Sequence, residues 1–108
     1  MYDNLIASAK AAAQNSTSKN KSGAALLSKG GQIYCGVSVG DDIFAEAVCL
    51  ANAVADKSQK FLALAVFAEQ ARDIDRIAAK NLFAFGDMWV ITCFNNKTES
   101  TLLSRIAR

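Results

Sequence analysis

The fold of this chain is decided by one stretch of sequence, SGAALLSKGGQIYCGVSV, which occupies residues 22–39. Two short apolar runs, at 23–28 and 32–39, are separated by Lys29-Gly30-Gly31. Glycines between two such runs supply the positive φ angles that a tight turn needs. The stretch therefore predicts an antiparallel β-hairpin.

The residues on either side of the hairpin predict helices and a buried strand. Residues 2–14 favour a helix, which the polar run 15–22 ends. Residues 44–57 are apolar nearly all round, which predicts a helix buried on several sides, and Asp41 and Asp42 are placed to cap its start. The continuous apolar run 61–67 is typical of a central strand covered on both faces.

The C-terminal part continues the alternation of helices and strands. We expect a helix over 73–85 ended by Gly86, a strand over 88–94, a turn at Asn95-Asn96-Lys97, and a last helix over 98–107 with Leu102, Leu103 and Ile106 facing inward. Strands joined by crossover helices pair in parallel, whereas a hairpin is antiparallel. We therefore predict a single α/β domain over residues 1–108, a three-layer α/β/α sandwich with a mixed sheet.

Composition excludes several classes of function. The chain has 108 residues, is 52% hydrophobic and carries a formal charge of +2, which is too little to predict a nucleic-acid or membrane partner. Its three cysteines, at 35, 49 and 93, have no short spacing, which favours a reducing compartment and a cytoplasmic location. We expect neither a signal peptide nor a transit peptide in residues 1–10, and no apolar run approaches the roughly 20 residues of a membrane helix. Histidine, the commonest zinc ligand, is absent.

The quoted stretch resembles the opening hairpin of the cytidine deaminases, where Val-Gly-Ala-Ala-Leu, a turn and Ile-Tyr-x-Gly-Val-Asn-Val follow one another. In the same register Val48-Cys49 lies where the family has the apolar residue and first zinc ligand of its Cys-Ala-Glu motif. Residues 61–66 resemble the Phe-x-Ala-Ile-Ala-Val strand, and residues 98–103 are similar to the closing segment. The resemblance thus spans nearly the whole chain and implies the cytidine deaminase fold.

The resemblance also implies that the catalytic residues are lost. Zinc deaminases need three His or Cys ligands and a glutamate that moves the proton. In this register the glutamate position is Ala51, and the two ligands of the Pro-Cys-x-x-Cys motif correspond to Asp75 and Ala78, so Cys49 is the only remnant ligand. We expect no catalytic residue, no bound zinc and no other cofactor.

Four residues are candidates for ligand binding. The family's Asn-x-Glu, which resembles a ribose clamp, corresponds to Ser38-Val39-Gly40, and Asp41 follows it. Glu46 lies one turn before Cys49 and is the candidate for a displaced acid.

Structural roles compete with these functional ones. Cys49, Cys35 and Cys93 fit small buried core residues. Asp73, Asp75 and Arg76 fit the solvated start of a helix. Trp89 fits core or subunit-interface packing.

These observations favour a catalytically inactive cytidine-deaminase-like protein that acts through oligomerisation or through binding a partner or a nucleoside-like small molecule. We expect a homo-oligomer, a dimer or tetramer, formed through the helix 44–57. The alternative is a cytidine-type deaminase or related hydrolase with an unusual zinc site around Cys49 and Asp75. A third hypothesis is a partner subunit that assembles with an active deaminase supplied by another chain.

Overall fold

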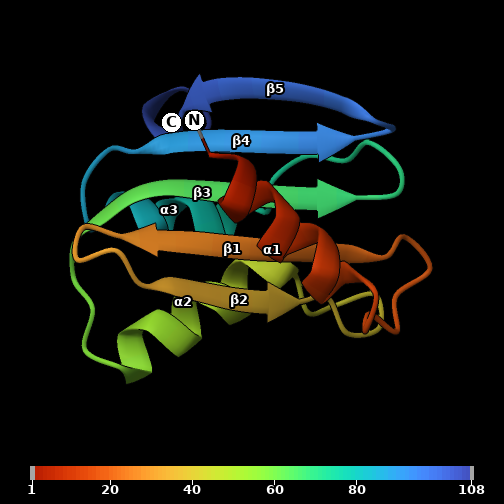
Figure 1. Ribbon diagram of the computed structural model, residues 1–108, viewed down its shortest axis with the longest axis horizontal. Helices are drawn as coiled ribbons and strands as arrows, with labels where there is room; N and C mark the ends of the chain where they lie inside the picture. Colours follow the sequence, from red (N-terminus) through yellow and green to blue (C-terminus); the bar gives the residue numbers. More distant parts are fainter. Residues whose placement is uncertain (1, 108) are drawn as a thin grey trace.

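The computed structural model describes residues 2–107 and contains a five-stranded sheet with helices on both faces. Figure 1 shows the strands in the order β2-β1-β3-β4-β5. In chain order the elements are α1 (Asp3–Ala13), β1 (Ser22–Ser28), β2 (Ile33–Val37), α2 (Ala45–Ala55), β3 (Phe61–Ala68), α3 (Arg76–Phe83), β4 (Trp89–Phe94), β5 (Lys97–Leu102) and the short 3-10 helix η1 (Leu103–Arg105).

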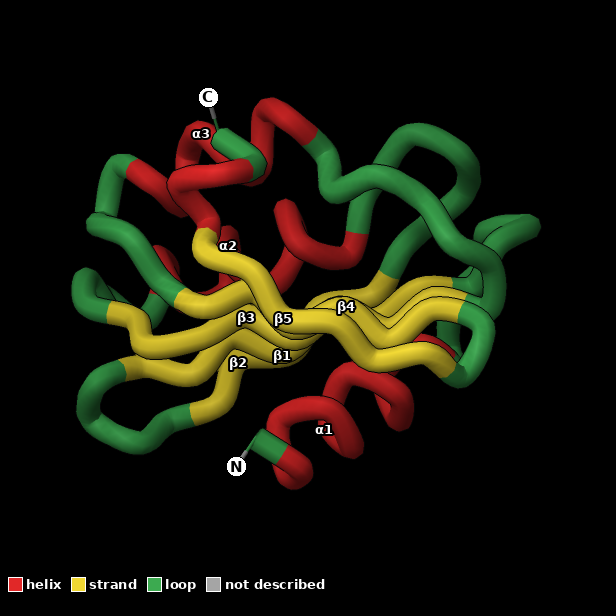
Figure 2. The backbone as a smooth tube through the Cα atoms, turned by 90° about the horizontal axis from the view of Figure 1, so that it is seen from above, coloured by secondary structure: helices red, strands yellow, loops and turns green. Residues whose placement is uncertain are grey.

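The sheet is mixed, as predicted. β1 pairs antiparallel with both β2 and β3, β3 pairs parallel with β4, and β4 pairs antiparallel with β5. The predicted hairpin is confirmed, with Leu27 opposite Ile33 and Gly23 opposite Val37. Seen from above, α1 lies on one side of the sheet and α2 and α3 lie on the other (Figure 2). The predicted three-layer α/β/α architecture is therefore confirmed.

The strand β3 is central, and apolar side chains leave it on both faces. Ala63 and Ala65 join the smaller core beneath α1, whereas Leu64 and Val66 join the larger core beneath α2 and α3. This confirms the prediction of a strand covered on both sides. Neither α1 nor α2, with 11 residues each, nor any other helix in the described range 2–107 has the length and apolar character needed to cross a bilayer.

Two glycines let helices lie directly on the sheet backbone. A Cβ atom on Gly23 would lie 2.0 Å from the carbonyl oxygen of Ala9 in α1. A Cβ atom on Gly36 would lie 2.3 Å from the carbonyl oxygen of Ala45 and 2.4 Å from the nitrogen of Cys49, both in α2. Because Ala24 in β1 is opposite Gly36 in β2, the two contacts lie on neighbouring strands of the hairpin. The hairpin therefore sets how closely α1 and α2 approach the sheet.

The helix predicted over 98–107 is wrong. Asn95 and Asn96 both have positive φ, 53° and 64°, and form a two-residue turn between β4 and β5. Asparagine tolerates this backbone, and such turns match the twist of antiparallel strands. Thr98 and Thr101 are β-branched and favour the strand that follows. Of the inward-facing residues predicted here, Leu103 is fully buried and Leu102 and Ile106 are partly buried.

The start of α2 also differs from the prediction. Phe44 is the N-cap residue and no side chain caps this helix, while Asp41 and Asp42 lie exposed in the preceding loop. Val39 and Ile43 pair with each other across that loop, which carries the two carboxylates away from the helix. Only one side of α2 is buried, because Ala51, Asn52, Val54 and Ala55 are exposed.

Three other residues are less buried than a place in the core would require. Cys35 is exposed because β2 is an outer strand, and its carbonyl oxygen accepts a hydrogen bond of 2.8 Å from the Asn52 side chain of α2. Trp89, at the start of β4, is 46% exposed and is not a core residue, so subunit-interface packing stays as the prediction for it. Cys93 is partly buried on β4.

Replacing Lys57 with glycine should stabilise the protein by about 1 kcal/mol. Lys57 lies two residues after the end of α2 and has φ at 63°, and the Ser58 N–H donates to the carbonyl oxygen of Ala53 in the pattern of a helix terminus that glycine favours. Urea-induced unfolding measures the gain. Lys60→Gly is the control: the φ of Lys60 is not positive, so glycine there should destabilise the protein. Equal effects at both positions would contradict the explanation.

Candidate functional site

A buried carboxylate lies where the first turn of α2 meets the start of α3. Glu46 is fully buried, and both of its sequence neighbours in α2 are alanines. Its two oxygens accept hydrogen bonds of 2.7 and 2.8 Å from the two terminal nitrogens of Arg72. The Asp75 N–H donates a third hydrogen bond, 3.0 Å long, to Oε2. The carboxylate therefore joins α2 to the segment between β3 and α3.

Most N–H donors of the Arg72 guanidinium are hydrogen-bonded to neighbouring groups. Besides the two bonds to Glu46, Nη1 donates to the Asp73 carbonyl oxygen at 3.0 Å and Nε donates to the Ser22 hydroxyl at 3.2 Å. The ring of Phe44 lies with its centroid 5.6 Å from the guanidinium carbon, within cation–π range. Arg72 is only 16% exposed in its side chain. The guanidinium is thus a fixed structural cation.

The pKa of Glu46 follows from this environment. Burial would by itself raise the pKa, but the hydrogen bonds and positive charge of Arg72, with the Asp75 N–H, hold it below the ordinary value for glutamate. Glu46 is therefore ionised at neutral pH. An ionised carboxylate held by two guanidinium bonds is neither a free general base nor a free acid.

Asp75 and Ala78, the two positions aligned with the second zinc motif, lie together at the start of α3. Asp75 is the N-cap residue of α3, which agrees with its predicted place at the start of this helix. Its Oδ2 accepts a hydrogen bond of 3.1 Å from the Ala78 N–H. The carboxylate thus satisfies the helix terminus. The methyl group of Ala78 offers no ligand.

Cys49, the third aligned position, is a core residue. It is fully buried in the core between α2 and the sheet, where its backbone lies against Gly36. Burial, with the charge of Glu46 nearby, raises the pKa of the Cys49 thiol far above its ordinary value. The thiol therefore stays protonated, and it donates to the Glu46 carbonyl oxygen. The predicted structural role of Cys49, a small buried core residue, agrees with this environment.

These residues do not fit a zinc ion. Cys49 is a protonated core thiol, Asp75 caps a helix and Ala78 has no donor atom. In the described range 2–107, no three side chains of His, Cys, Asp or Glu are grouped so that they could hold a metal. The side chains at the three aligned positions therefore lack the donor chemistry of a zinc site.

Three of the four ligand candidates line one small pocket. Ser38, Gly40 and Asp41 border a cavity of about 110 Å³, together with Phe44 and Arg72. Small-molecule pockets are usually about 300–1,000 Å³, so a nucleoside does not fit this one as it stands. The fourth candidate, Glu46, lies behind Arg72 and does not border the pocket.

The hydroxyl of Ser38 is also engaged within the protein. It lies 2.6 Å from the hydroxyl of Ser16 and accepts a hydrogen bond of 3.1 Å from the Ser22 N–H. Ser22 in turn accepts from Arg72, so one polar network runs from the end of α1 to the start of α3. Throughout the described residues, every buried side-chain nitrogen or oxygen has a partner. The network holds no spare buried group for a ligand.

A second, apolar groove separates α2 from α3. Its volume is about 460 Å³, and its lining includes Ala47, Leu50, Ala51, Val54, Ile77 and Phe85. Ala51, aligned with the glutamate, therefore faces the groove rather than the ion pair. Ile77 is 71% exposed and Val54 is 48% exposed beside it.

Arg72 is the residue of this site that sequence reasoning missed. No motif marks it, because the family pattern assigns no role to its position. One indication was available: a glutamate in an otherwise apolar helix needs a cationic partner if it is buried.

Comparison with known proteins gives the fold. No protein-family model matches the chain, and no curated protein sequence matches it. Among solved structures, the cytidine deaminase from Burkholderia pseudomallei superposes with a TM-score of 0.83 at 22% identity, over 98% of this chain and 95% of that one.

Two further structures agree. A glutamate-to-glutamine mutant of the cytidine deaminase from Mycobacterium tuberculosis has a TM-score of 0.72 at 19% identity, over 83% of this chain and 84% of that one. The cytidine deaminase from Mycobacterium leprae has a TM-score of 0.69 at 17% identity, over 96% of this chain and 94% of that one. The resemblance seen in the hairpin is thus confirmed for the architecture: this chain has the cytidine deaminase fold.

Proposed function

We propose that this chain is a catalytically inactive protein with the cytidine deaminase fold, which acts through self-association. The absence of catalytic activity is supported by one observation, the ion pair between Glu46 and Arg72. This pair occupies the junction of α2 and α3, where its groups satisfy one another's hydrogen bonds and charge. Deamination needs an activated water and a group that moves protons. A carboxylate fixed by a guanidinium, beside a helix cap and an alanine, supplies neither.

The alternative of a deaminase with an unusual zinc site around Cys49 and Asp75 gains no support from the contacts. The Cys49 thiol is buried in the core and donates to the Glu46 carbonyl oxygen, whereas the Asp75 carboxylate is bonded to the first turn of α3. The other two cysteines offer no replacement, since Cys35 is exposed on β2 and Cys93 lies on β4. A nucleoside would have to bind without the metal and outside the pocket of about 110 Å³ that the ligand candidates line.

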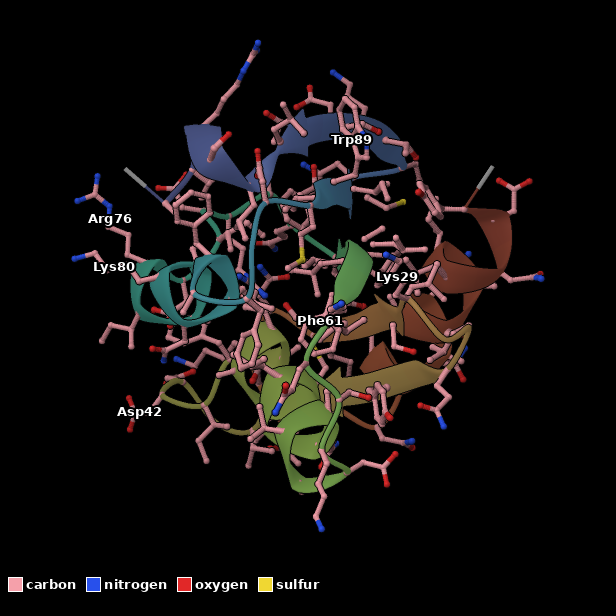
Figure 3. All side chains as sticks on the ribbon, turned by 90° about the vertical axis from the view of Figure 1, so that its left-hand side faces the viewer. Lys29, Asp42, Phe61, Arg76, Lys80 and Trp89 are labelled. Carbon is pink, nitrogen blue, oxygen red and sulfur yellow. The ribbon has the colours of Figure 1, made fainter. Side chains whose placement is uncertain are left out.

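Self-association is supported by the groove between α2 and α3. Contiguous apolar surface of this kind is typical of interaction sites. Figure 3 shows Arg76 and Lys80 projecting from α3 and Asp42 projecting from the loop before α2 on the same side of the molecule. A two-fold axis along the groove would set the acidic loop of one copy against the basic helix of the other. The occupant that fits both features is a second copy of this chain.

The mass in solution tests this proposal. At micromolar concentration, light scattering after gel filtration should give at least twice the 11.5 kDa of one chain. Ile77→Glu should abolish the oligomer, because it places an unpaired charge in the apolar groove. Ile33→Glu, the same substitution at an exposed isoleucine on β2, is the matched control and should leave the mass unchanged. A monomeric wild-type protein would contradict self-association.

The inactive half is tested on the same wild-type protein. Cytidine, uridine and zinc should each shift the melting temperature by less than about 1 °C, since only binding to the folded state raises stability. Protein purified without chelator should contain no stoichiometric zinc. A clear shift with cytidine, or one zinc per chain, would instead support the enzyme hypothesis. Co-purification of a second deaminase chain from the native source would support the partner-subunit hypothesis.

A further inference from the structure

The first residues of α2 offer a second match to the Cys-Ala-Glu motif. Phe44-Ala45-Glu46 differs from the motif only in its first residue. It lies five residues before Cys49-Leu50-Ala51, the triplet that follows without a gap from the hairpin. The connection that precedes it is short, because Val39 and Ile43 exchange two backbone hydrogen bonds across only three residues. A deletion in this loop would displace the motif toward the hairpin.

Contacts distinguish the two triplets. The aromatic ring of Phe44 and the carboxylate of Glu46 both face the guanidinium of Arg72. The same carboxylate bonds the N–H of Asp75, and Asp75 bonds the N–H of Ala78. In contrast, Cys49 is a buried core residue, and Ala51 lines the groove that Asp75 and Ala78 also line but has no side-chain atom that could hydrogen-bond to them. Both triplets thus border the start of α3, but only the earlier one bonds to it, through the carboxylate of Glu46.

We propose that Glu46 is the retained glutamate of the deaminase motif, that Phe44 has replaced its first metal ligand, and that the Arg72 guanidinium is a built-in cation in place of the metal. The glutamate position moves from Ala51 to Glu46. The charge balance is what makes the exchange feasible: a buried carboxylate needs a cation within hydrogen-bond distance, and Arg72 supplies it in bidentate geometry. Loss of the metal ligands then leaves no uncompensated charge.

This inference rests on the inactive half of the proposed function, and its test uses altered proteins rather than the wild type. Phe44→Cys, Asp75→Cys and Ala78→Cys are combined with Arg72→Ala, so that three thiols surround the space left by the guanidinium. The matched control keeps Phe44 and carries the other three changes, and therefore offers only the native Cys49 as a third thiol. Both proteins, this four-residue variant and its control, also carry Cys35→Ser, which removes an exposed thiol that could bind metal.

The four-residue variant should bind one zinc per chain, at least about tenfold more tightly than the control, because structural zinc sites need the full ligand set. Cobalt should give it the thiolate absorption bands of a tetrahedral site. Equal binding by variant and control would assign the ligand position to Cys49 and overturn the proposal. A folded variant that binds no zinc would also overturn it.

A second experiment decides the matter if the four-residue variant does not fold. Arg72→Ala alone leaves a guanidinium-shaped space beside Glu46. Methylguanidinium at about 10 mM should raise its melting temperature, or restore a folding transition, by binding the folded state. The wild type and Arg72→Ala combined with Glu46→Gln are the controls, and neither should respond. No rescue of Arg72→Ala would overturn the role of Arg72 as the internal cation.

Discussion

Replacing Arg72 with methionine is expected to lower the free energy of unfolding by about 3–5 kcal/mol, because it leaves the carboxylate of Glu46 buried without a cation. Methionine keeps much of the volume of arginine, so the loss reports the charge rather than a cavity. The Asp75 N–H alone cannot compensate the charge. Urea-induced unfolding at neutral pH measures the effect.

A double variant separates the charge from the packing. Glu46→Leu together with Arg72→Met removes both charges and should recover most of the stability lost in the single variant, since apolar replacements of buried ion pairs are often neutral or better. A loss below about 0.5 kcal/mol in Arg72→Met would place the pair among weak surface contacts and refute its structural role.

Acid should weaken the wild type through the same pair. The folded pKa of Glu46 lies below its unfolded value of about 4.3, so the stability it contributes is present above that pH and is lost as pH falls through the folded pKa. Glu46→Gln should have a shallower acid dependence. Asp87, whose pKa is also lowered by its hydrogen bonds from Ser104 and Met88 despite some desolvation, remains in both proteins and cancels in the comparison.

Replacing Gly36 with alanine is expected to destabilise the fold by about 3 kcal/mol or more, at the upper end of overpacking effects. The added methyl carbon would lie 2.3 Å from the Ala45 carbonyl oxygen and 2.4 Å from the Cys49 nitrogen. Both obstructing atoms belong to the backbone of α2, so no side chain can rotate away. The helix must move off the sheet and open the core around it. Thermal unfolding followed by circular dichroism measures the loss.

Gly30 provides the control for this experiment. It lies in the same hairpin, but a Cβ atom there would meet only the Ser28 hydroxyl at 3.8 Å, and its φ is not positive. Gly30→Ala should therefore change stability by less than about 0.5 kcal/mol. Similar effects at Gly30 and Gly36 would show that glycine flexibility, rather than the close approach of α2, explains the requirement at Gly36.

The sequence was sufficient for the elements with strong local patterns. The Lys29-Gly30-Gly31 turn between two apolar runs predicted the hairpin, and the apolar run at 61–67 predicted the central strand. These features depend on turn chemistry and side-chain period, which act over a few residues. The last strand was missed because Leu102, Leu103 and Ile106 have helical spacing, while pairing with β4 depends on the two-asparagine turn.

The site was harder to predict than the fold. Asp75 and Ala78 were brought together as their spacing on a helix requires. The partner of Glu46 is 26 residues away along the chain, and only the packing of the segment between β3 and α3 against the start of α2 brings Arg72 to it. A pattern that extends over a few residues contains no information about such a contact. The start of α2 was likewise fixed by the pairing of Val39 with Ile43 rather than by a capping carboxylate.

The hydrogen bond from Asn52 to the Cys35 carbonyl has a consequence for aggregation. An outer strand with free backbone groups is a template on which strands of other molecules can grow into fibrils. The amide of Asn52 occupies one of those groups on β2, so an incoming strand would meet an interrupted ladder there. At the opposite border of the sheet, β5 carries the charges of Lys97 and Glu99, which oppose the same process. Both borders of the sheet thus disfavour fibril growth while the helical surface remains available for contact.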